Sequence, residues 1–536
     1  MNERRWITLI ACVFLLHVVY LNCLSEDALI ALRFARNLAR GDGLVWNPGT
    51  PPVEGYTDFL WVILSAAAMR LGFPGVLFAQ ALSVVAGFAT LVLLYVIGRR
   101  FIGWPPAVAL VPAGLLAVSG PFAMWSSSAM ESTLFALLVV SATYAFALFW
   151  KQGSCRAVVA GAVLLVLATM TRPEGLLIAV LLLGTSALVA IAADRRSLPP
   201  LAVAAAVFLG LFGPYFLWRY QRYGFLLPNT FYVKTGGGVL QILRGGLLAF
   251  VFWMQFGLPL VPAVLTMLWE TGLPPARDLL PRPPLDWFRR HALFVFAALI
   301  VICYTAYNVA VGGDYMAMHR FFVPVLPFLY LLFGLPIALL YWRISRPANR
   351  AGLAALVLFT AAATFFPSTP LERSFFYAPP QQFGAYRGVV TSRWHVRRLA
   401  VIGQFFNRYR RDRAESLATT AIGAVGYYAD MQVFDIHGLV DVHIAHMPPP
   451  PDFGMARPGH GRKDLPYTFA LRPTYVMFSR DLTPEPIELW NYLTPDLRPS
   501  VEREYIHRSV WLDDEANQEH GYFTFFERRD SASRRP

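Results

Sequence analysis

The chain has 536 residues, of which 56% are hydrophobic and 15% are charged, and its formal net charge is +13. Soluble proteins carry about 25% charged residues, and several apolar runs here approach the roughly 20 residues that cross a bilayer. The composition therefore excludes a soluble protein and indicates one that crosses a membrane many times. Many basic residues lie in short loops between apolar runs, where they set orientation, so the positive charge does not indicate nucleic-acid binding.

The first apolar run, residues 6–24, follows Arg4 and Arg5 and looks like a secretory signal. No small-residue cleavage site follows it, and Asn22 before Cys23 argues against a lipoprotein signal. We therefore expect an uncleaved first span whose N-terminus lies in the cytoplasm. The four cysteines lie in or beside apolar runs and indicate neither a disulfide framework nor a zinc site.

The next segment, residues 25–75, is a long polar loop that we interpret as an active-site loop on the outer face. It begins with the acidic pair Glu26 and Asp27. Apolar residues then alternate with arginines, Arg33 among them, at helical spacing until Gly41, which predicts an amphipathic helix at the membrane surface. A carboxylate at the outer end of a span serves as a general base or a cation ligand, or it only solvates the helix end.

A second short helix is predicted later in the same loop. Glu54 and Tyr56 lead into the apolar stretch 59–71. If this stretch crossed the membrane, Arg99 and Arg100 would fall on the outer side, against the charge rule. We therefore expect 59–71 to be a surface helix.

Hydropathy and the charge rule together predict about eleven spans in a membrane domain formed by residues 1–366. Loops rich in arginine and lysine then fall in the cytoplasm, and loops that mix acids, amides, glycine and proline fall outside. An odd number of spans places the rest of the chain, residues 367–536, on the outer face. This tail has no spanning run and no cysteine, and it is long enough for its own core.

The tail is expected to be a soluble α/β domain. The predicted fold class is thus an α-helical polytopic membrane protein with a C-terminal soluble α/β domain. A basic amphipathic pattern predicts a helix at 393–411. Strands are predicted at 418–439, 474–478, 505–511 and 522–526.

Acidic and basic side chains recur in the loops that this topology places outside. Each has a structural explanation, such as a helix cap or an ion pair, but convergence at one membrane face implies one site. Basic residues next to lipid suit a lipid phosphate, and no Walker or Rossmann glycine motif indicates a soluble nucleotide donor. Besides Glu26 and Asp27, the candidate site residues in these outer loops are Glu54, Tyr56, Glu131, Arg172, Glu174, Asn229, Tyr232, Lys234, Asp314, His319 and Arg320.

The tail offers sugar-binding chemistry of its own. Aromatic faces and hydrogen-bonding groups gather at Tyr428, Asp435, His437 and Asp441, with His460 further along. The alternative is a strand-rich lid whose polar groups are satisfied within its core. The irregular spacing of the histidines and aspartates does not match a metal-ligand set, so we predict no metal site.

Taken in chain order, these motifs resemble a known family. The resemblance is to the integral-membrane GT-C glycosyltransferases and, within them, to the AftB-like terminal arabinofuranosyltransferases, whose relatives include flagellar motor control proteins. The matching segments are 27–36, 41–61, 171–175, 223–234, 312–327, 422–441 and 459–460.

The resemblance implies a bacterial inner-membrane enzyme with a periplasmic tail, a polyprenyl-phosphate-linked sugar donor, a cell-envelope glycan acceptor and a catalytic carboxylate in the first outer loop. Glu26-Asp27 stands where the family commonly has two aspartates, so both remain candidates for the base. Donor phosphate binding is expected of Arg172, Asn229, Lys234, His319 and Arg320. Substrate binding is expected of Arg33, Glu54, Tyr56, Glu131, Glu174, Tyr232, Asp314, Tyr428, Asp435, His437 and Asp441.

Two other functions remain open. A lipid-linked sugar flippase or transporter would place ionisable groups near the bilayer midplane, often within internal repeats. Here the polar groups cluster at one face and no repeat is visible. The other alternative is an assembly factor of the cell envelope or flagellar motor, which the large outer tail suits.

Overall fold

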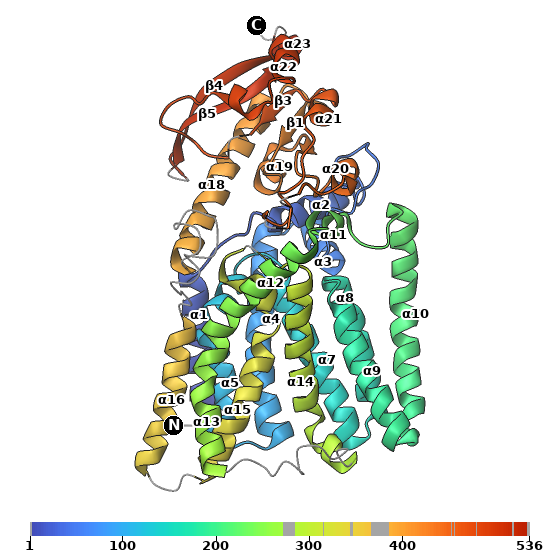
Figure 1. Cartoon of the computed structure of the whole chain (residues 1–536), viewed down its shortest axis with the longest axis vertical. Coiled ribbons are helices and arrows are strands. Elements are labelled where there is room, and N and C mark those ends of the chain that lie inside the picture. Colours follow the sequence, from blue (N-terminus) through green and yellow to red (C-terminus); the bar gives the residue numbers. More distant parts are fainter. Residues whose placement is uncertain are drawn as a thin grey trace.

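In the computed structural model, the chain forms a long helical bundle with a smaller α/β unit, the tail, on one end (Figure 1). The structure describes residues 3–271, 285–314, 316–343, 347–365, 385–451, 453–454, 456–478, 480–516 and 519–532. The expected domain boundary at residue 367 lies outside these residues. The N-terminus lies toward the end of the bundle away from the tail, and the C-terminus lies at the far end of the tail (Figure 1).

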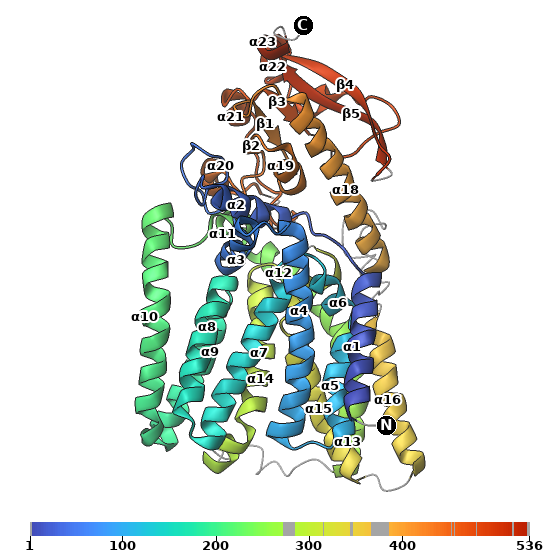
Figure 2. The ribbon, with the colours of Figure 1, turned by 180° about the vertical axis from the view of Figure 1, so that it is seen from behind.

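Apolar helices run roughly side by side in the bundle (Figures 1 and 2). They are α1 (Glu3–Tyr20), α4 (Gly75–Val96), α5 (Pro106–Val118), α7 (Ser132–Gln152), α8 (Cys155–Thr171), α9 (Gly175–Ala193), α10 (Leu198–Tyr223), α12 (Gly238–Phe252), α13 (Val261–Thr271), α14 (Leu285–Ala310), α15 (Leu326–Arg343) and α16 (Pro347–Phe365). Short π or 3₁₀ turns adjoin them at η1 (Ile97–Ile102), η2 (Arg195–Ser197), η3 (Trp253–Gly257) and η4 (Leu258–Leu260).

The number of spans agrees with the expected topology once short helices are included. Within the described ranges, seven helical segments are long and apolar enough to cross a membrane, and the bent pair of α5 and α6 (Gly120–Ser126) would make an eighth. Helix α1 carries Glu3, Arg4 and Arg5 in its first turn, and α8 and α16 hold shorter apolar segments. Counted together with the eight, these three helices would give the eleven spans predicted.

The active-site loop forms the two predicted helices, α2 (Ala28–Arg40) and α3 (Phe59–Arg70), at the end of the bundle next to the tail (Figure 2). Helix α2 ends at Gly41, which has a left-handed backbone (φ 92°) and donates its N–H to the carbonyls of Asn37 and Leu38. The glycine signal in the sequence therefore located the end of this helix correctly.

Helix α2 lies at the end of the bundle, but its polar side does not face water as that of a surface helix would. Leu29 and Leu32 are fully buried, as predicted for the apolar face, but Arg33 is only 1% exposed as well. Helix α19 (Gly423–Ala429) of the tail packs on α2 and covers its polar side. The alternating pattern therefore reflects an apolar face toward the bundle and a polar face toward the tail, not toward water.

The tail contains a five-stranded sheet in the order β2-β1-β3-β5-β4. Strand β1 pairs in parallel with β2 and β3, whereas β5 is antiparallel to β3 and β4. The strands are β1 (Ser416–Thr419), β2 (Gln432–Asp435), β3 (Tyr475–Met477), β4 (Tyr505–Asp514) and β5 (Glu519–Arg528). The helices not yet named are α11 (Asn229–Lys234), η6 (Ala317–Phe322), α18 (Ala385–Tyr409), α20 (Val442–His446), α21 (Leu465–Ala470), η7 (Leu489–Tyr492), α22 (Arg498–Glu504) and α23 (Arg529–Ala532).

One strand predicted in the tail is wrong. The apolar run 418–439 forms the end of β1, then α19, then β2. A continuous apolar run does not distinguish strand from buried helix by periodicity, and the two parallel strands need a crossover between them. The other three expected strands match β3, β4 and β5 and are confirmed. The expected basic helix is confirmed too, although α18 begins before residue 393.

A single apolar core runs from the membrane helices into the tail. Phe34 of α2, Leu417 of β1 and Val425 of α19 are all fully buried within it. A smaller core surrounds Val476 and Phe526 in the sheet. The tail is therefore packed onto the active-site loop, and this packing creates the walls of the site described next.

Candidate active site

A cavity of about 780 Å³ lies between the tail and the ends of the membrane helices nearest to it. Its walls come from the start of α2, the loop before α3, α11, η6, α18 and loops of the tail. The predicted site residues that line it are Glu26, Asp27, Tyr56, Glu131, Arg172, Glu174, Lys234, Asp314, Arg320, Asp435 and His437. Loops that are hundreds of residues apart thus converge at one depth.

Asp27 lies at the N-terminal end of α2 and faces the arginine of η6. Its Oδ2 lies 3.3 Å from Nη1 of Arg320, and its side chain is 22% exposed. The Nε of Arg320 lies 2.5 Å from Oδ2 of Asp314, and Arg320 itself is buried. Within the described part of the chain, Arg320 is the one polar partner of the Asp27 carboxylate. Asp27 therefore remains accessible to a ligand in the cavity.

Glu26 is engaged with the tail instead. Its Oε1 accepts a hydrogen bond from the Ala424 N–H at 3.0 Å, in the first turn of α19. Position 423 must be glycine for this contact, because a Cβ there would lie 2.6 Å from Oε1 and 2.2 Å from the Glu26 carbonyl oxygen. Burial and the charge of Asp27 raise the pKa of Glu26 to about 7. Glu26 thus fastens α19, whereas the Asp27 carboxylate stays accessible in the cavity.

Arg172 forms a closed ion cluster in the cavity wall. Its Nη1 lies 2.7 Å from Oε1 of Glu131, and its Nη2 lies 2.8 Å from Oε1 of Glu174. All three side chains are buried. Asp58 is buried nearby, and burial together with the charge of Glu131 raises its pKa well above the usual range. Because Glu131 and Glu174 already neutralise the charge of Arg172, this arginine is poorly suited to bind a phosphate directly.

Lys234 lies at the end of α11 and is half-buried. Nowhere in the described ranges does a carboxylate or hydrogen-bond acceptor pair with its ammonium group. Burial lowers the pKa of Lys234, and the charge of Asp27 acts in the opposite direction. Gly459 lies beside this side chain, and a Cβ at that position would be in ordinary van der Waals contact with Lys234 Cε, at 3.4 Å. Lys234 is therefore a cation available to an anionic ligand.

His319 does not line the cavity, although we predicted that it binds phosphate. Met318 and His319 both have left-handed backbones, with φ of 59° and 48°, which costs about 1–3 kcal/mol for each such residue. The His319 ring lies against Phe252, and its Nε2 is 2.5 Å from Oε1 of Gln255. The kink turns His319 into the bundle and presents the next residue, Arg320, to Asp27. His319 is therefore an anchor for this turn.

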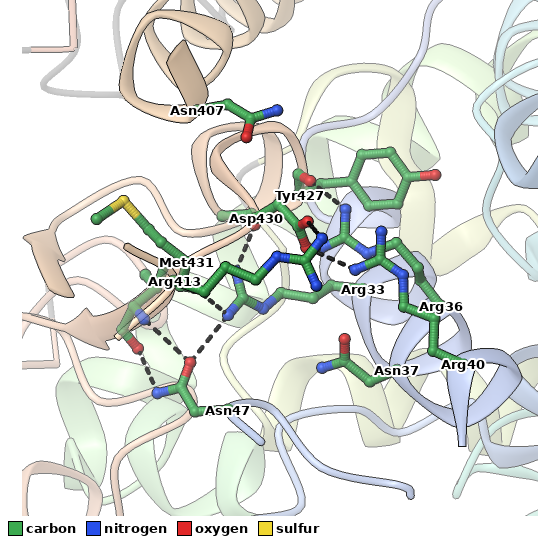
Figure 3. A network of polar contacts seen from close by, with 12 residues as sticks. Arg33, Arg36, Asn37, Arg40, Asn47, Asn407, Arg413, Tyr427, Asp430 and Met431 are labelled. Atoms are coloured by element: carbon green, nitrogen blue, oxygen red, sulfur yellow. Dashed lines mark hydrogen bonds and ion pairs between the residues drawn. The ribbon is translucent and has the colours of Figure 1, made fainter. Parts of the chain in front are cut away.

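Arg33 also lies outside the cavity, in a buried network between α2 and the tail (Figure 3). It donates to the Gly426 carbonyl, to the Met431 carbonyl at 2.8 Å and to Oδ1 of Asn47 at 2.9 Å. Asn47 in turn pairs with both backbone groups of Val433 in β2, at 3.0 Å each. The predicted substrate-binding residue Arg33 is thus part of the attachment of the tail.

Asp430 completes this attachment (Figure 3). It lies 3.4 Å from Arg36 and 2.6 Å from Arg40 on α2, and 3.1 Å from Arg413 of the tail. Burial alone would raise the pKa of Asp430, but the hydrogen bond from Arg40 and the charge of Arg36 lower it. The arginines that gave α2 its amphipathic pattern therefore bind a carboxylate of the tail.

The remaining predicted residues outside the cavity also fasten the tail or its supports. Glu54 forms a buried bidentate pair with Arg219 of α10, at 2.6 and 2.7 Å. The Asn229 amide donates to the carbonyls of Gly438 and Leu439 at 2.9 and 3.0 Å. Asp441 caps α20, Tyr428 packs near Gly403 of α18, and Tyr232 accepts a hydrogen bond from Arg462 through its carbonyl.

Asp435 and His437 line the tail side of the cavity. The Asp435 carboxylate accepts from the backbone N–H groups of His437 at 2.8 Å and Val440 at 3.2 Å, so it shapes its own loop. Burial raises its pKa to about 6, against the effect of these hydrogen bonds. Burial lowers the pKa of His437 to about 4 and that of His460, whose ring is 5.0 Å away, to about 3. Both rings are therefore neutral at pH 7.

The sequence did not predict several further residues of the cavity wall, among them Asp58, His395, Arg457 and Arg480. Asp58 follows Tyr56 by two positions, so its place in the same loop was an available signal. The other three stand among many basic residues of the tail, and no local pattern distinguishes them. Across the described residues, no group of three His, Cys, Asp or Glu side chains is placed to hold a metal ion.

Comparisons with known proteins agree with this architecture. A family described as a domain of unknown function (DUF8728) matches residues 387–526 of the tail. A terminal beta-(1->2)-arabinofuranosyltransferase of Corynebacterium glutamicum is 27% identical over 360 residues, which cover 59% of this chain and 48% of that protein. The chain thus spans about half the length of this relative.

Two crystal structures of ArnT from Cupriavidus metallidurans match nearly the whole chain, covering 98% of each protein. The structure bound to undecaprenyl phosphate has a TM-score of 0.56 at 15% identity, and the apo structure has 0.57 at 14%. These matches establish the fold from the first helix to the tail. The chain is thus a multi-pass membrane protein with the fold of ArnT, the GT-C fold, and its similarity to a terminal arabinofuranosyltransferase agrees with the resemblance to the AftB-like family.

Proposed function

We propose that the protein is a membrane glycosyltransferase that moves a sugar from a polyprenyl-phosphate donor to a glycan acceptor of the cell envelope. Arabinofuranose is the first sugar to test, because the similar protein of Corynebacterium glutamicum is named for it. The observation that carries the proposal is Asp27, held by Arg320 within a cavity that the membrane helices and the tail share. The undecaprenyl phosphate bound by ArnT supports a lipid phosphate as the donor's carrier.

In the proposed reaction, Asp27 takes the proton from a hydroxyl group of the acceptor. The acceptor oxygen then forms a bond to the anomeric carbon of the donor sugar, and the bond from that carbon to the phosphate oxygen breaks. Polyprenyl phosphate leaves with the electron pair. Arg320 fixes the orientation of the Asp27 carboxylate through its contact at 3.3 Å.

The leaving phosphate needs positive charge as its own negative charge develops. Lys234 supplies it best, since the described residues give its ammonium no carboxylate partner, and Arg320 adds a second cation close to Asp27. Arg172 is held by Glu131 and Glu174. We therefore assign Arg172 a supporting role in the wall of the site.

The proposed location is the bacterial inner membrane, with the cavity and the tail on the periplasmic side. The arginine-rich turns after α4 and α9, at η1 and η2, lie at the end of the bundle opposite the tail (Figure 2). Positive loops favour the cytoplasm, which supports this orientation.

The decisive experiment compares Asp27→Asn with Glu26→Gln in the purified full chain. Each variant is incubated with synthetic polyprenyl-phosphate arabinofuranose, and with lipid-linked hexoses, and the glycan products are analysed. We expect D27N to lower transfer by about 10²–10⁴-fold. E26Q should retain most activity, because its amide oxygen still accepts from Ala424.

Full transfer by a folded D27N variant would refute the assignment of the base. A wild-type protein that moves lipid-linked sugar across vesicle membranes without forming any transfer product would instead favour the transporter function.

A further inference from the structure

Arg480 is a hydrogen-bonded cation on the tail side of the cavity, remote in sequence from every residue of the proposed donor site. Its Nε donates to Thr420 Oγ1 at 3.1 Å, and its Nη2 donates to the Thr420 carbonyl at 3.2 Å. The same Nη2 lies 3.3 Å from Nε2 of His437. These contacts fix the guanidinium plane and leave the two hydrogens of Nη1 without a bonded partner among the described residues.

His437 is set up to hold Arg480 without neutralising it. An arginine only donates hydrogen bonds, so Nε2 of His437 is the acceptor in their contact. The proton of the ring is then on Nδ1, which donates to the Arg462 carbonyl at 3.2 Å. A neutral imidazole orients the guanidinium but contributes no negative charge to it. His437 is thus a positioning residue for Arg480.

Among the residues that the structure describes, the carboxylates close to this wall do not form an ion pair with Arg480. Glu26 is near enough to be affected by the charge of Arg480, but its Oε1 is bound to the backbone of α19. Asp435 is bound to the backbone of its own loop. Asp481, the next residue in the chain, pairs with Arg398 at 3.1 Å. Arg480 therefore faces the cavity with no carboxylate partner in the described ranges, in contrast to Arg172 with its two glutamates.

We propose that Arg480, oriented by His437 and Thr420, binds an oxyanion carried by the acceptor, either a phosphate or a carboxylate on the glycan. The inference rests on the proposed function for the identity of the acceptor. A guanidinium group is well matched in geometry and charge to both oxyanions. This subsite lies on the tail side of the cavity, whereas the donor phosphate is assigned to Lys234 and Arg320. The enzyme would then prefer acidic acceptor glycans over neutral ones.

Binding measurements on the full chain in nanodiscs test the subsite without requiring sugar transfer. The probes are a hexose 1-phosphate, a hexuronate and the neutral methyl glycoside of the same hexose, each titrated by calorimetry. Undecaprenyl phosphate is titrated separately to report on the donor site. The variants are Arg480→Gln and Arg480→Lys, with Arg503→Gln as the matched control, because Arg503 is an exposed arginine of the tail outside the cavity.

We expect wild type to bind at least one of the two anionic sugars at least tenfold more tightly than the neutral glycoside. R480Q should lose this preference, R480K should keep part of it, and R503Q should not change it. Binding of undecaprenyl phosphate should stay within about twofold in all three variants. The probe that depends on Arg480, phosphate or uronate, identifies the acidic group.

Equal binding of the charged and neutral sugars by the wild-type protein would overturn the proposal, and this comparison needs no variant to fold. An R480Q variant that folds and retains the full preference would overturn it as well. If binding of undecaprenyl phosphate alone depended on Arg480, the residue would belong to the donor site instead. Failure of the glycosyltransferase proposal would show separately, as loss of undecaprenyl phosphate binding or absence of any transfer product.

Discussion

Gly55 allows a direct test of whether the active-site loop and the tail must pack tightly. A Cβ added at this position would lie 2.2 Å from Cγ1 of Val440 in the tail. Non-bonded carbon atoms do not approach so closely, so Gly55→Ala must push the loop and the tail apart. Overpacking of a tight core costs about 1–3 kcal/mol. We expect G55A to lower the free energy of unfolding by about this amount and to reduce sugar transfer, because Tyr56 of the cavity wall is the next residue.

Val440→Ala is the matched partner for this substitution. It removes Cγ1, after which the nearest atom to the new Cβ is Val440 Cβ at 3.3 Å. On its own, V440A loses two buried methyl groups and should cost about 1.6 kcal/mol, at about 0.8 kcal/mol for each group. The double variant should therefore be more stable than the sum of the single effects predicts, by about 1–3 kcal/mol.

The assay is unfolding of the purified full chain in detergent for wild type, both single variants and the double variant, with sugar transfer measured on the same preparations. A double variant whose destabilisation equals the sum of the two single effects would show that Gly55 and Val440 do not clash. A G55A protein as stable as wild type would show that the tail is not held against the loop at this contact. Either result would refute the packing that shapes the cavity.

Three further predictions test charge. Lys234→Gln should weaken binding of undecaprenyl phosphate about tenfold or more, measured by calorimetry, because it removes a cation that no described carboxylate neutralises. Asp430→Asn should lower the free energy of unfolding by about 1–2 kcal/mol, since partly exposed ion pairs contribute up to about 1 kcal/mol each, and should make stability less sensitive to salt. The raised pKa of Glu26, about 7, means that the folded protein binds a proton that the unfolded chain releases near its ordinary value. Stability should therefore fall as pH rises from about 5 to 7, and E26Q should reduce that slope in thermal unfolding scans.

The membrane helices were predictable because the signal is local. The run that forms α9 is apolar along its whole length. It is therefore predicted as a membrane helix whatever the rest of the chain contains. The tail shows the opposite case. The run 418–439 has the same apolar composition as a buried strand, but a helix interrupts it as the crossover between two parallel strands. The first turn of this helix donates a hydrogen bond to Glu26, almost 400 residues earlier. No window of sequence contains both partners.

Contacts between distant segments also decide which carboxylate is proposed as the general base. Glu26 and Asp27 are neighbours, and chemistry alone makes either carboxylate a base. Only the structure shows that Glu26 contacts Gly423 and Ala424 while Asp27 contacts Arg320 at the cavity. The sequence motifs correctly marked the segments that meet at the site. They did not separate residues that line it from those that fasten the tail, because both kinds are polar residues in the same loops.

The balance of charge around the cavity distinguishes residues that can bind a ligand from residues that only support its walls. Arg219 is paired with Glu54, and Arg172 lies between Glu131 and Glu174. A buried ion pair of this kind satisfies its own charges and supports a wall. Lys234 and Arg480 differ, because no described carboxylate pairs with either of them although both line the cavity. A charge left uncompensated in a partly buried site costs free energy unless a ligand neutralises it. One such cation stands in the membrane part and one in the tail, so the arrangement fits two separate anions, the donor phosphate and an acidic group of the acceptor, with Asp27 exposed to the same cavity.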